Sequence, residues 1–366
     1  MALKVAIVGL PNVGKSTLFN ALTETAAAQA ANYPFCTIEP NVGEVAVPEP
    51  RLDALAKIAG SKEIIPARIT FVDVAGLVRG AAQGEGLGNQ FLANIRDCDA
   101  IALVVRCFED GDIAHVEGRI DPLADIDIID TELMLADLES LERRLPALEK
   151  RAKAGGDKEA QATLRLALLA KTELDAGRPA RAAKVPEDEA KAWRMLQLLT
   201  AKPALFVANV DEASAATGNA LSERVAERAA RDGAEHVAIS ARIESEIALL
   251  DPAERTEFLE ALGLETPGLD RLIRAAYHLL GLQTYFTAGP KESRAWTIPV
   301  GAAAPEAAGV IHTDFEKKFI RAETIAYDDY VRLGGESGAR ANGRLRAEGR
   351  DYLVKDGDVM NFLHGG

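Results

Sequence analysis

One segment near the start of the chain limits the possible folds more than any other. It is KVAIVGLPNVGKSTLFNAL, residues 4–22. Val5 to Val8 is a short, largely β-branched run typical of a buried strand. Residues 9–16 match G-x-x-x-x-G-K-[ST], and an amphipathic helix begins at Ser16. A strand, a glycine-rich loop and a helix in this order predict a P-loop, whose main-chain N–H groups surround phosphates.

The P-loop residues have distinct predicted roles. Lys15 is expected to reach the β- and γ-phosphates and to take part in catalysis, and the Ser16 hydroxyl is expected to ligate Mg²⁺. Because the loop main chain and the helix N-terminus would contact the phosphates, a contiguous set of nucleotide-binding residues is predicted: Asn12, Val13, Gly14, Lys15, Ser16 and Thr17.

Composition restricts the class of protein. The chain has 366 residues, a length typical of two or three domains, and a net charge of −14, which does not favour nucleic-acid binding by the whole surface. No uninterrupted apolar run is long enough to span a membrane. The first residues form a predicted strand, so no cleaved signal is expected. Three cysteines without paired spacing fit a reducing compartment, so we expect a cytoplasmic protein.

Hydrophobic patterns predict three regions. In residues 1–130 and 201–282, apolar runs alternate with helical segments, which predicts an α/β domain with a mostly parallel sheet flanked by helices. Residues 131–200 have apolar residues at helical spacing on both sides of an AGGD turn, which predicts an inserted helical hairpin or coiled coil. Its acidic and basic residues nearly balance, as on a solvated helix pair. Residues 283–366 predict a small mixed domain with a single helix at HTDFEKKFI.

The rest of a phosphate and metal site follows the P-loop in the chain. Asp73 ends the apolar segment ITFVD, where an aspartate commonly holds Mg²⁺, and Gly76 follows at the spacing that lets its N–H meet the γ-phosphate. Thr37, in NYPFCTIEPN, is the candidate for a threonine that closes on the ion. The predicted metal ligands are therefore Ser16, Thr37 and Asp73.

The residues that would contact the base depart from the guanine pattern N-K-x-D. The corresponding segment is Asn209-Val-Asp-Glu212, with Val210 in place of the lysine and Glu212 in place of the aspartate. An aspartate there accepts hydrogen bonds from guanine N1–H and the 2-amino group, and adenine has neither donor. A glutamate displaces the carboxylate, which weakens selection of guanine. Ser240 and Ala241 open a second predicted base loop.

Together these motifs resemble the YchF/Ola1 family of Obg-related P-loop NTPases over nearly the whole chain. The matching segments are GLPNVGKST, NYPFCTIEPN, DVAGLVRGAAQGEGLGNQFL, NVDE, SARIESE, AWTIPVG, AAGVIHTDFEKKFIRAETIAYDDYV and DYLVKDGDVMNF. The resemblance implies a G domain (1–130 and 201–282), a coiled-coil insertion (131–200) and a C-terminal TGS domain of β-grasp type (283–366). It also implies ATP hydrolysis, often in preference to GTP, and association with the ribosome, with possible RNA contact through the coiled coil and the TGS domain.

The residue that positions water is not evident from the motifs. Leu77 follows Gly76 where many GTPases have a water-orienting glutamine, and leucine cannot serve. Either hydrolysis is slow and depends on a partner, or another residue acts. From the residues alone, His115 is better explained as an exposed loop histidine. The resemblance implies a catalytic histidine in this segment, and His115 is its only histidine.

The sequence therefore predicts a Mg²⁺-dependent ATPase that acts as a nucleotide-controlled switch on the translation machinery, with weaker binding of GTP. Two alternatives remain open. One is a guanine-selective GTPase of the Obg type, which Asn209 permits and Glu212 disfavours. The other is a ribosome- or RNA-binding module that holds nucleotide structurally and barely hydrolyses it.

Overall fold

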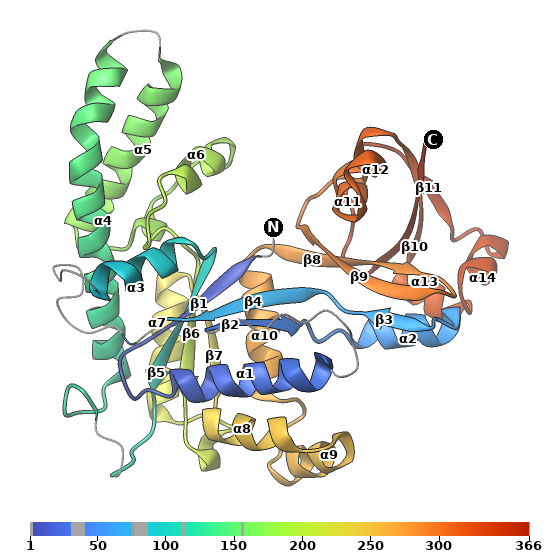
Figure 1. Cartoon of the computed structure of the whole chain (residues 1–366), viewed down its shortest axis with the longest axis horizontal. Helices are drawn as coiled ribbons and strands as arrows, with labels where there is room; N and C mark the ends of the chain where they lie inside the picture. The colour runs from blue at the N-terminus through green and yellow to red at the C-terminus, as the bar shows by residue number, and fades with distance from the viewer. Residues whose placement is uncertain are drawn as a thin grey trace.

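The computed structural model describes residues 3–30, 41–74, 76, 87–111, 115–154 and 157–365 (Figure 1). The strands are β1 (Lys4–Val8), β2 (Val42–Ala46), β3 (Glu63–Ile65), β4 (Arg68–Asp73), β5 (Ala100–Arg106), β6 (Ala204–Asn209), β7 (Glu235–Ile239), β8 (Leu282–Ala288), β9 (Glu292–Pro299), β10 (Phe319–Ala326), β11 (Arg346–Glu348) and β12 (Asp358–His364). The helices are α1 (Lys15–Ala30), α2 (Pro50–Ala59), α3 (Leu87–Arg96), α4 (Pro122–Lys153), α5 (Lys158–Asp175), α6 (Ala190–Met195), α7 (Ala220–Asp232), α8 (Ala241–Leu249), α9 (Pro252–Ala261), α10 (Gly268–Leu279), α11 (Ala304–Ile311), α12 (Thr313–Lys317), α13 (Tyr327–Arg332) and α14 (Glu336–Ala341), with 3₁₀ turns η1 (Ala180–Ala182), η2 (Glu187–Glu189) and η3 (Glu212–Ser214).

The first sheet carries the P-loop. Its strand order is β2-β4-β1-β5-β6-β7, with β2 antiparallel and the other neighbours parallel. Every residue of the central strand β5 is buried, which explains its continuous apolar sequence. Helix α1 packs on β2 and β4, whereas α7 and α10 pack on β6 and β7. Because β1, β4 and β6 are parallel, their carboxyl ends bring the P-loop, Asp73 and Asn209 to one edge.

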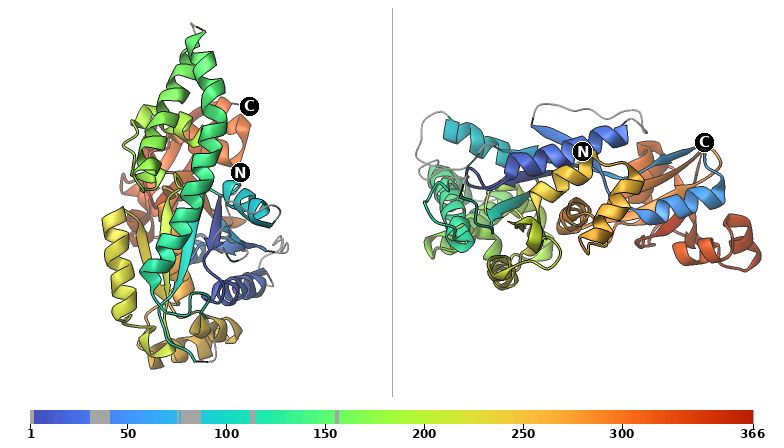
Figure 2. Two further views of the ribbon diagram at one scale, coloured as in Figure 1. Left: turned by 90° about the vertical axis from the view of Figure 1, so that its left-hand side faces the viewer. Right: turned by 90° about the horizontal axis from the view of Figure 1, so that it is seen from below.

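The helical insertion is a long hairpin that projects from this domain (Figures 1 and 2). Helices α4 and α5 pack through a leucine- and alanine-rich cluster that includes Leu141, Leu166 and Ala170. The predicted boundary at residue 131 falls inside α4. The reason is local: Asp121 caps the helix, Pro122 occupies its first turn, and no break occurs before Lys153. The domain limits drawn from the sequence otherwise stay a prediction.

The second sheet does not follow chain order. Its strand order is β11-β10-β12-β8-β9-β3, so β3, which lies between two strands of the first sheet in sequence, pairs in parallel with β9. Helix α2 contacts β8 and β9, and the Arg51 guanidinium lies 2.7 Å from the Asp356 carboxylate. One apolar core joins both sheets and includes Leu52, Leu55 and Phe286. The sheets are therefore parts of one packed unit.

The C-terminal region contains more helix than the sequence predicted. The single expected helix corresponds to α12, but α11, α13 and α14 are also present. Helix α11 was missed because its alanine-rich sequence lacks polar residues that mark a periodic pattern, although Ala304, Ala307 and Ala308 are fully buried. A mixed sheet packed on α11 agrees with the β-grasp architecture that the resemblance implied. Within the described residues, no helix has the length and apolar character to cross a membrane.

This junction gives a stability prediction. A chain that ends at Gly281 lacks β9, the strand that pairs with β3, and it exposes Leu52 and Leu55 on α2. Since each exposed leucine costs about 1.5–3 kcal/mol, we expect the melting temperature to fall by about 10 °C. Thermal unfolding followed by circular dichroism measures this. A monodisperse truncated chain that melts at the full-length temperature would show that the two sheets are independent.

Candidate functional site

The P-loop main chain adopts conformations that depend on its sequence. Asn12 and Gly14 have positive φ angles of 62° and 98°. At Gly14 a side chain is also excluded by space, because a Cβ atom there would lie 2.2 Å from the Asn209 Nδ2 atom. The loop then enters α1, whose first-turn residues Ser16 and Thr17 are exposed. This leaves the predicted Mg²⁺-ligating hydroxyl and the helix N-terminus accessible to a ligand.

Lys15 is folded back into the loop. Its ammonium group donates to the Leu10 carbonyl at 2.6 Å, and the residue is only 7% exposed. Burial lowers the pKa of Lys15 to about 8, and the nearby Asp73 carboxylate partly opposes this effect. A buried ammonium held by a carbonyl is well placed to turn toward an anion that enters the loop.

Asp73 and Gly76 lie beside this lysine. A Cβ atom at Gly76 would be 3.3 Å from the Lys15 Nζ atom and 3.1 Å from the Pro11 Cγ atom, so the glycine packs directly on the P-loop. The Asp73 Oδ1 atom is buried and has no hydrogen-bond partner among the described residues. Burial raises the pKa of Asp73, and Lys15 lowers it in part. An orphaned carboxylate oxygen fits a role as ligand to Mg²⁺ or to a water on the ion.

Asn209 connects the P-loop to the second base loop. Its Nδ2 atom donates to the Val13 carbonyl at 2.9 Å, and its Oδ1 atom accepts from the Ala241 N–H at 3.0 Å. Ser240 caps α8 through a bond from the Ile243 N–H to its hydroxyl. These contacts are buried, so the two loops are held in a fixed relation before a ligand arrives.

The two residues that replace the guanine pattern lie in different environments. The Val210 side chain is 2% exposed and packs in the core. Glu212 begins η3 at the surface, where its Oε1 atom is 2.7 Å from the Arg242 Nε atom. A carboxylate therefore stands beside the base loops, but it is engaged by an arginine.

The His115 side chain is buried, in contrast to the exposed loop histidine that the residues alone favoured. This side chain is 4% exposed, and its Nε2 atom lies 3.0 Å from the Asp125 Oδ2 atom. The Glu117 N–H donates to Nδ1 at 3.2 Å, so the ring proton is on Nε2 and is donated to Asp125. Burial raises the pKa of Asp125, and His115 opposes the shift. In this state both ring nitrogens are engaged, so neither is free to hold a water.

The predicted site residues do not all lie together in the structure. Thr37 and Leu77 lie outside the described residues. The structure brings together Lys15, Asp73 and Gly76 at the P-loop, and Asn209, Glu212 and Ala241 at the base loops. The ring of His115 hydrogen-bonds to Asp125 and Glu117, which belong to neither group.

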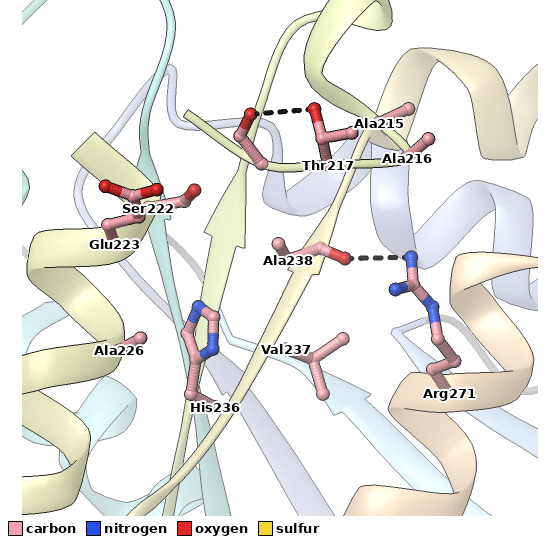
Figure 3. A pocket seen from close by; sticks show the side chains of 11 residues that line it. Ala215, Ala216, Thr217, Ser222, Glu223, Ala226, His236, Val237, Ala238 and Arg271 are labelled. Carbon is pink, nitrogen blue, oxygen red and sulfur yellow. Dashed lines mark hydrogen bonds between the residues drawn. The ribbon is translucent and has the colours of Figure 1, made fainter. Parts of the chain in front are cut away.

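A cleft of about 460 Å³ lies elsewhere, at the outer edge of the first sheet (Figure 3). It is bordered by α7, β7 and α10, with His236 and Arg271 among its lining residues. The Arg271 guanidinium donates to the Ala238 carbonyl at 3.1 Å, which caps this edge of β7. No predicted nucleotide-binding residue lines the cleft, so the phosphate site is separate from it.

Two polar partners in these sites were missed by sequence reasoning. Asp125 lies in the first turn of α4, where it would be expected only to favour the helix dipole. Arg242 follows Ser240-Ala241 in the predicted second base loop, and it is its contact with Glu212 that was not predicted. The N-terminal signal at Asp121-Pro122 could have placed Asp125 on a helix, but the path of the loop that brings His115 to it could not be read from residue spacing.

Known proteins similar to this chain are consistent with the geometry. A family model described as 50S ribosome-binding GTPase matches residues 4–150, and the model YchF-GTPase_C, described as a protein of unknown function, matches residues 282–364. The Ribosome-binding ATPase YchF of Haemophilus influenzae is 59% identical over 362 residues, which cover 99% of both chains. The chain belongs to the YchF family. The YchF protein of Bacillus subtilis, also named a ribosome-binding ATPase, is 51% identical over 99% of both chains.

A solved YchF structure confirms the fold. The YchF GTPase of Schizosaccharomyces pombe has a TM-score of 0.87 and 37% identity, covering 99% of this chain and 97% of its own. The P-loop domain and the YchF C-terminal region predicted from the sequence are thus both confirmed as family features, and the chain is a P-loop nucleotide hydrolase of YchF type.

Proposed function

We propose that this chain is a Mg²⁺-dependent ATPase that acts in the cytoplasm as a nucleotide-controlled switch on the ribosome. The observation that carries the proposal is the cluster at the P-loop, in which the buried Lys15 lies beside Asp73 and Gly76 and one Asp73 oxygen has no partner in the described residues. The relatives at 51% and 59% identity are named ribosome-binding ATPases, which supports the activity and the partner.

The chain's residues divide the work of hydrolysis. Lys15 leaves the Leu10 carbonyl and contacts the β- and γ-phosphates, while the P-loop N–H groups hold their oxygens. Ser16, Asp73 and Thr37 would hold Mg²⁺, which when bound neutralises charge on the phosphates. Gly76 offers its N–H to the γ-phosphate. The experiment that tests this is phosphate release from ATP with Mg²⁺ and after its removal by a chelator, with hydrolysis expected only in the first case.

We propose His115 as the residue that accepts a hydrogen bond from the attacking water. For this to happen, Nδ1 must exchange the Glu117 N–H for water, or the ring must leave Asp125. Asp125 fixes the proton on Nε2, so Nδ1 is the nitrogen with a lone pair to offer. A histidine whose two ring nitrogens are engaged by Asp125 and the Glu117 N–H is compatible with a low rate until the ribosome is bound.

The proposed base preference is ATP over GTP. Glu212 replaces the aspartate whose carboxylate would accept from guanine, and it is held by Arg242. The alternative, a guanine-selective GTPase, is permitted by Asn209 and is supported by the name of the Schizosaccharomyces pombe relative, which is called a GTPase. The second alternative, a module that binds nucleotide and barely hydrolyses it, is distinguished from the ATPase and the GTPase by turnover measured with and without ribosomes.

We further propose that the α4–α5 hairpin and the C-terminal sheet contribute surfaces for the ribosome or its RNA.

Substitution of Glu212 tests the base assignment. We expect Glu212→Asp to shift relative affinity toward guanine by at least tenfold, because the shorter carboxylate returns to the position that accepts from N1–H and the 2-amino group. Titrations with non-hydrolysable ATP and GTP analogues measure the ratio. The matched change Glu257→Asp, at an exposed glutamate on α9, should leave the ratio unchanged. Equal ratios in wild type and Glu212→Asp would place base choice elsewhere.

A further inference from the structure

The two base loops are joined at the surface by one ion pair. The Arg242 Nε atom lies 2.7 Å from the Glu212 Oε1 atom, and it is 3.8 Å from the Glu246 Oε1 atom on the next turn of α8. Arg242 lies in the first turn of α8, which follows β7, and Glu212 begins η3, which follows β6. The guanidinium therefore lies close to two carboxylates, next to the predicted base loops.

This pair contributes little to the stability of the fold. The Arg242 and Glu212 side chains are 76% and 46% exposed, and ion pairs of this kind contribute about 0–1 kcal/mol. The loops are already held together by the buried bond from the Ala241 N–H to Asn209. Both charged groups are accessible to a ligand, so their arrangement matters for binding more than for folding.

The arrangement opposes guanine in two ways. Guanine presents N1–H and a 2-amino group, and a carboxylate reads them with both of its oxygens, but one oxygen of Glu212 is engaged by Arg242. Guanine also presents an O6 acceptor to the second base loop. The Ala241 N–H, which could donate to it, is already donated to the Asn209 Oδ1 atom. Binding guanine would require breaking one or both contacts.

The same arrangement suits adenine. Adenine presents an acceptor at N1 and a donor at its 6-amino group, side by side. The guanidinium offers further N–H donors next to the second Glu212 oxygen, which is an acceptor. We propose that Arg242 is a base-specificity residue: with Glu212 it forms a donor–acceptor pair that reads the N1 and 6-amino edge of adenine and withholds the carboxylate from guanine. This inference rests on the proposed ATP preference and names the group that produces it.

Removal of the guanidinium tests the inference. Arg242→Met keeps most of the aliphatic stem and frees Glu212, so the ratio of GTP to ATP dissociation constants should fall at least fivefold. Titrations use non-hydrolysable ATP and GTP analogues on the full chain. Arg242→Lys, which keeps a cation and its donors, should retain part of the preference. The control is Arg231→Met, which removes an exposed arginine on α7 (68% exposed) and should leave the ratio unchanged.

Two further measurements distinguish recognition of the base by Arg242 from a general effect of its charge. At saturating ATP, the control variant Arg231→Met should hydrolyse at the wild-type rate, because Arg231 lies on α7 and outside both base loops. In a cycle with Glu212→Gln, the double variant should change the ratio no more than the larger single change, since the two residues act as one unit. Additive effects would overturn the inference.

The outcomes for the two proposals differ. If the wild-type chain prefers ATP but Arg242→Met keeps the same ratio within twofold, Arg242 is not a specificity residue and the proposed function stands. If the wild-type chain prefers GTP, both the ATP preference and this inference fail. A fall in the ratio with Arg242→Met but not with Arg231→Met supports the assignment.

Discussion

His115→Ala is expected to lower the rate of ATP hydrolysis at least tenfold and to leave ATP affinity nearly unchanged. A positioned base typically contributes about 10²–10⁴-fold, and its contribution belongs to the transition state and not to the bound ground state. Single-turnover hydrolysis with excess enzyme measures the chemical step directly. His278→Ala is the matched control, since that histidine is 83% exposed and distant in sequence from the P-loop.

One complication of this variant can be removed by design. Loss of the imidazole leaves the Asp125 carboxylate buried without the histidine that it contacts, which destabilises the fold. The double variant His115→Ala with Asp125→Asn removes the buried charge and should recover thermal stability but not activity. Hydrolysis at the wild-type rate in either folded variant would show that His115 has no chemical role. The positioning of the attacking water would then be assigned to a partner.

Lys15→Ala is expected to weaken triphosphate binding by about 100-fold, roughly 2.7 kcal/mol, because it deletes the cation that faces the β- and γ-phosphates. Titration with a non-hydrolysable ATP analogue measures the loss. The control Lys57→Ala removes an exposed lysine on α2. The protein without nucleotide should remain folded, because the ammonium group that is lost is a buried charge, and burial of a charge opposes folding. Near-normal affinity in a folded Lys15→Ala chain would overturn the site.

Much of the phosphate site could be predicted because its parts are local in sequence. A strand, a glycine-rich loop and a helix occur within residues 4–22, and Asp73 is the last residue of a strand parallel to β1. Parallel strands must place these segments at one edge, so the proximity of Lys15 and Asp73 follows from topology. The glycine at position 14 is explained by its positive φ angle and by the close approach of the Asn209 side chain.

The features that were not predicted depend on contacts between distant segments. Pairing of β3 with β9 joins residues more than 200 positions apart, and no local pattern in EII indicates which sheet it enters. The burial of His115 against Asp125 depends on the path of a loop, and the ion pair of Glu212 with Arg242 depends on how two loops face each other. The chemical type of each side chain was evident from the sequence, but the residue that it contacts in the fold was not.

The ATP preference is tested most directly by paired equilibrium titration of the full-length chain with non-hydrolysable ATP and GTP analogues, in the presence of Mg²⁺. We predict tighter binding of the ATP analogue, because Glu212 and Arg242 together leave the contacts that select guanine unavailable. Binding of the GTP analogue at least tenfold more tightly, about 1.4 kcal/mol, would contradict the account and assign the chain to the guanine-selective alternative.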